Sequence, residues 1–191
     1  MTSRRRFLAA GAALAASPLV AADDIPWTRL REGRLVLLMR HGATEAGLGD
    51  PAGYRLEDCR TQRNLSDAGR TEARHVGERL REARVPIAKV YTSPWCRCRE
   101  TAQLAFGMAE DWEPLSSFFD FPEREAEYTR AVLKRIAGYV RHPAGGNVVM
   151  VTHNVNIAAL TKHSVGTATL VPVRPDGCCS ARPMQPCRLE E

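Results

Sequence analysis

Lysine is scarce in this chain of 191 residues, with only Lys89, Lys134 and Lys162 among its 27 basic residues. The formal net charge is +5, but residues 1–22 carry three arginines and no acidic residue. The remaining chain therefore holds 24 basic against 22 acidic residues, a net charge near +2. Because nucleic-acid-binding proteins usually present a clustered basic face, the composition argues against a nucleic-acid partner.

An apolar run long enough to span a membrane is also missing, since a spanning helix needs about 20 residues. The alanine-rich stretch from Leu8 to Leu19 is shorter, and it follows the twin-arginine pattern Ser3-Arg4-Arg5-Arg6-Phe7. Val20-Ala21-Ala22 has the small side chains that suit a signal-peptidase site. We therefore predict a twin-arginine signal peptide over residues 1–22, cleaved after Ala22. The mature protein is expected in the periplasm or outside the cell, without stable membrane insertion.

The sequence lacks C-x-x-C pairs, the spacing that is typical of structural zinc sites. Its six cysteines allow fifteen complete pairings. A metal site built from Cys96, Cys98 and Cys59 is conceivable, but buried thiols or one or two disulfides fit an oxidising compartment better. We expect neither a metal nor another cofactor. The six are Cys59, Cys96, Cys98, Cys178, Cys179 and Cys187.

Internal repeats and linkers are absent, and the length suits one domain. Residues 23–191 are predicted to form that domain, with a tail from about residue 183. Apolar runs alternate with helical patterns, which is typical of an α/β fold. We expect three layers, with helices on both faces of a mostly parallel sheet and a C-terminal edge hairpin. After a polar leader over 23–33, strands are expected at 35–39, 87–92, 113–119 and 148–151, helices at 67–84, 94–106, 122–140 and 156–162, and hairpin arms at 167–173 and 178–182.

Two predicted strands each end in a histidine. Arg40 and His41 follow the first strand, His153 follows the strand over 148–151, and Arg97 lies in the helix that opens after a third strand. Ligands of open α/β sheets bind at the carboxyl ends of the strands. Arginines present two-pronged donors that match a phosphate, and a neutral imidazole can attack phosphorus. A second, cationic imidazole can stabilise charge on the phosphate oxygens, so no metal is needed.

Four motifs follow one another along the chain: L-L-M-R-H-G-A-T at 37–44, N-L-S-D-A-G-R-T-E-A at 64–73, Y-T-S-P-W-C-R-C-R-E-T-A at 91–102 and V-V-M-V-T-H-N at 148–154. In this order they resemble the histidine phosphatase superfamily, also called phosphoglycerate mutase-like, over residues 35 to about 160. By that resemblance His41 is the phosphorylated nucleophile. Arg40, Arg97 and His153 then form the phosphate pocket.

The same resemblance implies a carboxylate that protonates the leaving group, usually after a further strand. Asp120 follows the predicted strand over 113–119 and is the expected donor, with Glu123, Glu113 and Glu45 as alternatives. Asp120 could instead be a helix N-cap, a position that also favours Asp. The sequence leaves both readings open.

The expected activity is hydrolysis of a phosphate monoester through a phosphohistidine, with a small phosphorylated substrate. Mutases of the superfamily carry a longer insertion before the second histidine, and the short span from Arg97 to His153 leaves no room for it. The size suits the small branch that includes phosphohistidine phosphatases, whereas export points to an extracytoplasmic phosphate ester. A phosphate-binding protein without turnover is the alternative from another class. Nothing in the sequence specifies an oligomeric state.

Overall fold

A five-stranded sheet forms the centre of the protein. The computed structural model describes residues 27–141 and 145–173. The strands lie in the order β3-β2-β4-β1-β5, and all neighbours are parallel except β5, which runs antiparallel to β1. The mostly parallel sheet predicted from the sequence is therefore confirmed. The strands are β1 (Val36–Arg40), β2 (Ile87–Thr92), β3 (Glu110–Asp111), β4 (Asn147–Thr152) and β5 (Leu170–Val173).

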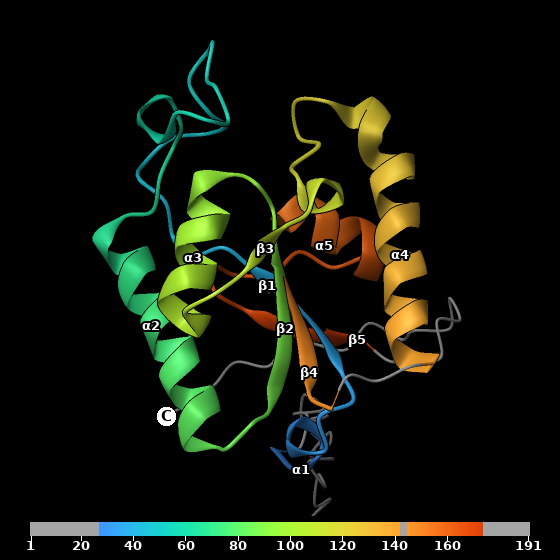
Figure 1. The fold of residues 1–191 in the computed structure, drawn as a ribbon. Coiled ribbons are helices and arrows are strands. Elements are labelled where there is room, and N and C mark those ends of the chain that lie inside the picture. The colour runs from blue at the N-terminus through green and yellow to red at the C-terminus, as the bar shows by residue number, and fades with distance from the viewer. Residues whose placement is uncertain (1–26, 142–144, 174–191) are drawn as a thin grey trace, which may run out of the picture.

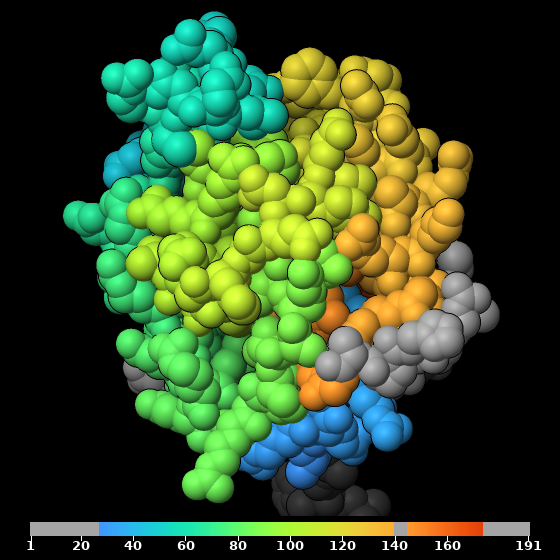
Figure 2. All heavy atoms as spheres, viewed as in Figure 1, coloured from blue at the N-terminus to red at the C-terminus, as the bar shows by residue number. Residues whose placement is uncertain are grey.

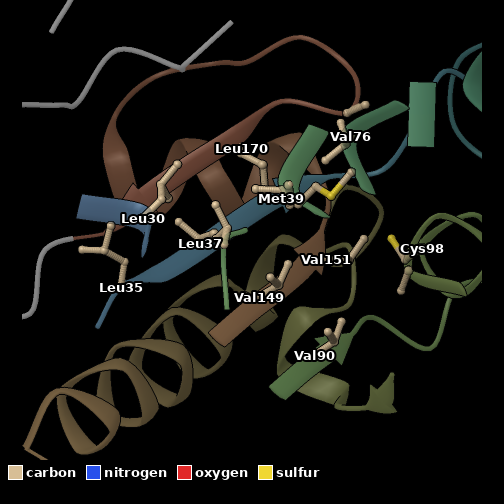
Figure 3. Close-up of a cluster of buried hydrophobic side chains, with 14 residues drawn as sticks. Leu30, Leu35, Leu37, Met39, Val76, Val90, Cys98, Val149, Val151 and Leu170 are labelled. Atoms are coloured by element: carbon tan, nitrogen blue, oxygen red, sulfur yellow. The ribbon is translucent and has the colours of Figure 1, made fainter. Parts of the chain in front are cut away.

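Helices cover both faces of the sheet, as expected for three layers (Figure 1). Because successive strand residues point to opposite faces, Leu37 and Met39 enter one core and Val36 and Leu38 enter the other. Figure 3 shows the first core, between the sheet and the side of α2 and α3. The other core packs under α4 and α5. The helices are α1 (Trp27–Arg31), α2 (Asp67–Glu82), α3 (Cys96–Phe106), α4 (Glu125–Arg141) and α5 (Asn154–Thr161), with short 3-10 turns η1 (Cys59–Thr61), η2 (Glu113–Leu115) and η3 (Pro122–Arg124).

The loop after β1, residues 41–66, packs directly on the first turn of α2. Ser66 caps this helix, because its hydroxyl accepts a hydrogen bond from Gly69 N over 3.2 Å. A Cβ on Gly42 would lie 2.4 Å from Gly69 O, and one on Gly69 would lie 1.9 Å from Ala43 O. Only glycine allows the two backbones to approach so closely. This contact fixes the chain immediately after His41.

The strand predicted over 113–119 is wrong. Residues Glu113–Leu115 form η2, and the short strand β3 precedes them at Glu110–Asp111. Pro114 has no N–H to donate to a sheet, and Leu115 turns inward to become fully buried in the core under α4. The apolar content that suggested a strand therefore reflects two buried side chains outside any strand, Leu115 and Phe118, whereas Phe119 is exposed.

The two ends of the predicted fold differ in how much the structure describes. The leader contains a helix that was not expected, α1, and Trp27 in it packs against the core under α2 and α3. β5 forms over Leu170–Val173 within the first predicted hairpin arm, at the edge of the sheet beside β1. The second arm, the tail from 183 and the signal peptide over 1–22 lie outside the described residues. Within 27–141 and 145–173, no helix has the length and hydropathy needed to cross a membrane.

Candidate active site

The carboxyl ends of β1 and β4 bring the two predicted histidines together. β1 and β4 are parallel neighbours in which Arg40 pairs with Thr152, so His41 and His153 each follow a matched position. Their ring centroids lie 5.3 Å apart. His41 N donates to Thr152 O over 3.1 Å, and this bond ties the two strand ends to each other. The predicted convergence of both histidines thus follows from the register of the sheet.

His41 is a buried, neutral imidazole with one free nitrogen. Its Nδ1 lies 2.8 Å from Gly42 O, and because a carbonyl only accepts, Nδ1 is the protonated nitrogen. Burial and then the charges of Arg97 and Arg40 lower the pKa of His41 to about 3, although the hydrogen bond to Gly42 acts in the opposite direction. The lone pair on Nε2 is therefore available for attack.

His153 has the opposite tautomer. Arg97 Nη2 can only donate and lies 3.5 Å from His153 Nδ1, whereas Nε2 lies 2.9 Å from Ser93 Oγ. Burial and then the charge of Arg97 hold the pKa of His153 well below its usual value. The cationic imidazole expected from the sequence is thus neutral in this site. Among the described residues, no carboxylate contacts the ring to offset the charge of Arg97.

Arg97 lies at the centre of the site and is 4% exposed. Its Nη1 donates to both carboxylate oxygens of Asp50, over 3.0 and 2.9 Å. The guanidinium also stacks on Trp95, 4.6 Å from the ring centroid. Arg40 is anchored differently, because its Nη1 donates to Val165 O over 2.5 Å. Two different contacts therefore fix the two predicted arginines.

Two residues of this site were not predicted from the sequence, Asp50 and Arg63. Both belong to the loop after β1, which has no periodic pattern to interpret. Asp50 accepts from Arg63 N over 2.8 Å, and burial followed by the charge of Arg97 lowers the pKa of Arg63. Arg63 directly precedes the N-L-S motif, a signal that could have marked it. Nothing in the sequence marks Asp50.

Three buried guanidinium nitrogens have no hydrogen-bond partner in the described part of the chain: Nε of Arg40, Arg63 and Arg97. Leaving a buried donor unsatisfied costs about 1–3 kcal/mol, and more for a charged group. The pKa of Arg40 is also lowered, first by burial and then by Arg63, so like charges crowd the site. An anion that accepts from these donors would remove both costs. The arrangement is thus suited to an oxyanion such as phosphate.

The predicted proton donors are exposed, whereas the two histidines and Arg97 are buried. Asp120 is exposed, and its charge contributes after burial to a raised pKa of Tyr54, whose ring stacks on Trp95 at 4.6 Å. Phe121, not Asp120, is the N-cap residue of η3. Glu113 accepts from the Tyr128 hydroxyl over 2.9 Å. The alternatives Glu113, Glu123 and Glu45 are exposed as well.

A disulfide fastens the loop after β1 to the helix that carries Arg97. Cys59 in η1 is bonded to Cys96, the first residue of α3, and Gln62 Oε1 accepts from Cys96 N over 3.0 Å. Cys98 is a buried free thiol, and its Sγ lies 3.5 Å from His153 Nε2. The described cysteines thus show both predicted states. Cys178, Cys179 and Cys187 lie outside the described residues. Within residues 27–141 and 145–173, no group of side chains could together hold a metal ion.

Reduction of this disulfide is expected to lower both stability and activity. The bond joins two residues separated by 37 positions in the sequence. A disulfide that closes a loop of that size stabilises the folded protein by about 3–4 kcal/mol. Without it, the segment that holds Asp50 and Arg63 loses its covalent link to α3. Denaturant unfolding with and without reductant measures the change, with the double variant Cys59→Ala/Cys96→Ala as the control that reductant should no longer affect. Equal stability in both conditions would contradict this role.

The space over the site is bounded by two segments that are far apart in the sequence. The loop after β1 and the segment before α4 (residues 116–124) lie side by side at the top of the molecule (Figures 1 and 2). A Cβ on Gly49 would lie 3.9 Å from the ring of Phe119. His41 and His153 are only 5% and 3% exposed beneath them. Two surface grooves, one along α2 and α3 and one along α4 and α5, contain none of the site residues.

The chain matches one protein-family model and resembles many solved structures. The family model described as the histidine phosphatase superfamily (branch 1) matches residues 36–116. The protein histidine phosphatase SixA with tungstate is 19% identical, with a TM-score of 0.55 over 75% of this chain and 90% of that one. Rv3214 from Mycobacterium tuberculosis is 21% identical, with a TM-score of 0.56 over 81% and 96%. A mycobacterial glucosyl-3-phosphoglycerate phosphatase with VO3 is 18% identical, with a TM-score of 0.53 over 73% and 92%. No curated protein sequence matches significantly.

Proposed function

Because this chain belongs to the histidine phosphatase superfamily, we propose that it hydrolyses a phosphate monoester through a phosphohistidine at His41. The observation that carries the proposal is a set of three buried arginine Nε donors that have no partner in residues 27–141 and 145–173. They lie beside a neutral imidazole whose Nε2 carries the lone pair. Positive charge and positioning are what phosphoryl transfer mainly requires. A protein that only binds phosphate has no need for this imidazole.

In the proposed reaction, His41 Nε2 attacks phosphorus and the leaving-group oxygen departs on the opposite side. Arg40 and Arg97 hold the other phosphate oxygens, and Arg63 adds a further guanidinium. The negative charge of the bound phosphate favours protonation of His153, which then donates to the phosphate as well. Water then attacks the phosphohistidine and releases inorganic phosphate. The span between Arg97 and His153 is 56 residues, which supports water rather than a second substrate hydroxyl as the acceptor.

A small phosphorylated molecule is the proposed substrate. The solved neighbours are a protein histidine phosphatase and a glucosyl-3-phosphoglycerate phosphatase, but identities of 18–19% support the fold alone. A phosphohistidine in another protein is the second candidate, because the length of the chain suits the small branch that includes phosphohistidine phosphatases. Comparing turnover of a phosphohistidine peptide with that of a set of sugar, alkyl and nucleoside phosphates separates the two.

We also propose export by the twin-arginine route, with a mature protein that begins at Asp23. The pattern in residues 3–8 and the disulfide between Cys59 and Cys96 support it, because disulfides persist in oxidising compartments. Cell fractionation of the full chain and of a variant with lysines at Arg4, Arg5 and Arg6 tests it. Equal amounts of both chains outside the cytoplasm would contradict this route.

Hydrolysis of p-nitrophenyl phosphate tests the proposed function, and we expect it to persist after dialysis against EDTA. The arginines already supply the positive charge that a metal ion would. An acid-labile phosphoenzyme should accumulate on rapid quenching. Absence of turnover from pH 4 to 8 would favour the phosphate-binding protein, and loss of activity that a divalent ion restores would contradict metal independence.

A further inference from the structure

Asp50 is a buried acid in contact with the central arginine of the site. Its side chain is 2% exposed, although the loop that carries it lies at the surface. Arg97 Nη1 donates to both of its oxygens, and Arg63 N donates to one of them. This carboxylate therefore removes one of the positive charges that a phosphate would require. A phosphate site that keeps a buried anion on its own arginine calls for an explanation.

The other acids near the site have different partners. Glu72 is bound by Ala43 N over 2.8 Å and by the Thr167 hydroxyl over 3.1 Å, so its two oxygens hold the loop after His41 in place. Asp120 and Glu123 are exposed. Within the described residues, Asp50 alone joins a carboxylate to Arg97, the arginine that also contacts His153.

We propose that Asp50 is the proton donor of the reaction, and that it takes up its proton when a phosphate group joins it on Arg97. This inference rests on the proposed function of the site. Arg97 Nη1 is occupied by Asp50, whereas Nε has no partner in the part of the chain that the structure describes, so an incoming phosphate binds the other side of the same guanidinium. Two anions on one guanidinium repel each other, and like charges in one site favour protonation of one of them. A carboxylic acid beside the phosphate results.

The proton balance of the two half-reactions follows. In the first, the bond between His41 Nε2 and phosphorus forms and the ester P–O bond breaks. The Asp50 proton passes to the leaving oxygen, which departs as an alcohol. In the second, the oxygen of a water molecule attacks phosphorus while the Asp50 carboxylate takes a proton from that water, and the P–N bond breaks. Inorganic phosphate leaves and His41 is regenerated.

Several ionisable groups face Asp50, and any of them that takes up a proton on phosphate binding would compete with Asp50 as the explanation. Arg97 and Cys98 approach from α3, Tyr54 and Arg63 from its own loop, and His153 and His41 lie beyond Arg97. The Cys98 pKa is raised to about 12 and the Tyr54 pKa is also raised, both chiefly by burial, so neither exchanges a proton near neutral pH. The two histidines are the competing proton acceptors.

Sulfate binding to the mature protein tests the coupling without any turnover, because sulfate is a dianion that does not titrate near neutral pH. Uptake of one proton by Asp50 makes sulfate affinity fall tenfold per pH unit where Asp50 is ionised before binding. In Asp50→Asn this tenfold dependence should disappear and leave only the dependence due to His153, with binding at pH 8 at least as tight as in the parent. Weaker binding by Asp50→Asn at every pH, with the slope kept, would show that Asp50 only positions Arg97 and would overturn the proposal. A slope that persists in full with unchanged affinity would assign the proton to a histidine and overturn it as well.

Turnover supplies the second test, with two substrates that differ in their need for an acid. General acid assistance is worth roughly 10²- to 10⁴-fold for a poor leaving group, whereas p-nitrophenolate departs unaided. Asp50→Asn should lose that factor with an alkyl phosphate and lose less than about tenfold with p-nitrophenyl phosphate. Glu57→Gln, an exposed acid of the same loop, is the matched control.

Asp120→Asn decides between the two assignments in the same assay. If the selective loss on the alkyl phosphate appears in Asp120→Asn and is absent from Asp50→Asn, Asp120 is the donor and the proposal for Asp50 fails. Equal losses on both substrates in Asp50→Asn would also overturn it. Failure of the proposed function looks different, because the parent protein itself would then neither hydrolyse p-nitrophenyl phosphate nor form a phosphoenzyme.

Discussion

His41→Ala should abolish turnover, with a loss of roughly 10⁴- to 10⁶-fold, the range seen when a covalent nucleophile is removed. The reason is positional as well as chemical, because the main chain of His41 is held by Thr152 O on one side and by Ala168 N on the other. No phosphoenzyme should be trapped after rapid quenching with p-nitrophenyl phosphate. His75→Ala, which removes an exposed histidine on α2, should retain activity. A phosphoenzyme that persists in His41→Ala would show that another residue is the nucleophile.

The acid range gives an additional check on the same residue. Because its pKa is lowered from 6.5 to about 3, His41 keeps its lone pair as the pH falls through 6.5. The first turnover with p-nitrophenyl phosphate should therefore still form phosphoenzyme at pH 5. The same lowered pKa makes the folded protein less stable at acidic pH. The unfolded chain binds a proton below pH 6.5 that the folded protein excludes, so stability falls as the pH drops from 6.5 towards 3, by up to about 1.4 kcal/mol per pH unit for this group.

Arg97→Lys should lower kcat/KM by about 10²- to 10³-fold, the typical cost of losing one preorganised donor at a developing charge. A lysine keeps the charge, but a single ammonium cannot contact Asp50, His153 and a phosphate in one plane as the guanidinium can. Phosphate inhibition constants and kcat/KM for p-nitrophenyl phosphate measure the loss.

Arg99→Lys is the matched control for Arg97→Lys. Arg99 lies one residue beyond Cys98 on the same helix, but it is half exposed and pairs with Asp111, away from the histidines. Its replacement should change kcat/KM less than about twofold, since exposed ion pairs contribute little. Near-normal turnover of Arg97→Lys, equal to that of Arg99→Lys, would show that Arg97 does not hold the phosphate.

The sequence by itself determined the sheet and the positions of four site residues. Apolar runs such as 35–39 and 148–151 must be buried on both faces, which dictates a mostly parallel sheet under helices. Parallel strands end at one edge, so Arg40 and His41 had to lie near His153 once their strands became neighbours. Arg97 followed because its helix opens at the same edge. These inferences depend only on local patterns and on chain direction.

The tertiary structure decided what lies in the loop after β1 and what each ionisable group does. Asp50 and Arg63 reach the site through contacts with Arg97, a residue more than thirty positions away, and no periodic pattern precedes them. The pairing of Cys59 with Cys96, chosen from fifteen possibilities, depends on the same contact between loop and helix. The neutral state of His153 follows from burial beside Arg97. Local sequence encodes elements, whereas burial and charge at a site are sums over segments that only the folded chain brings together.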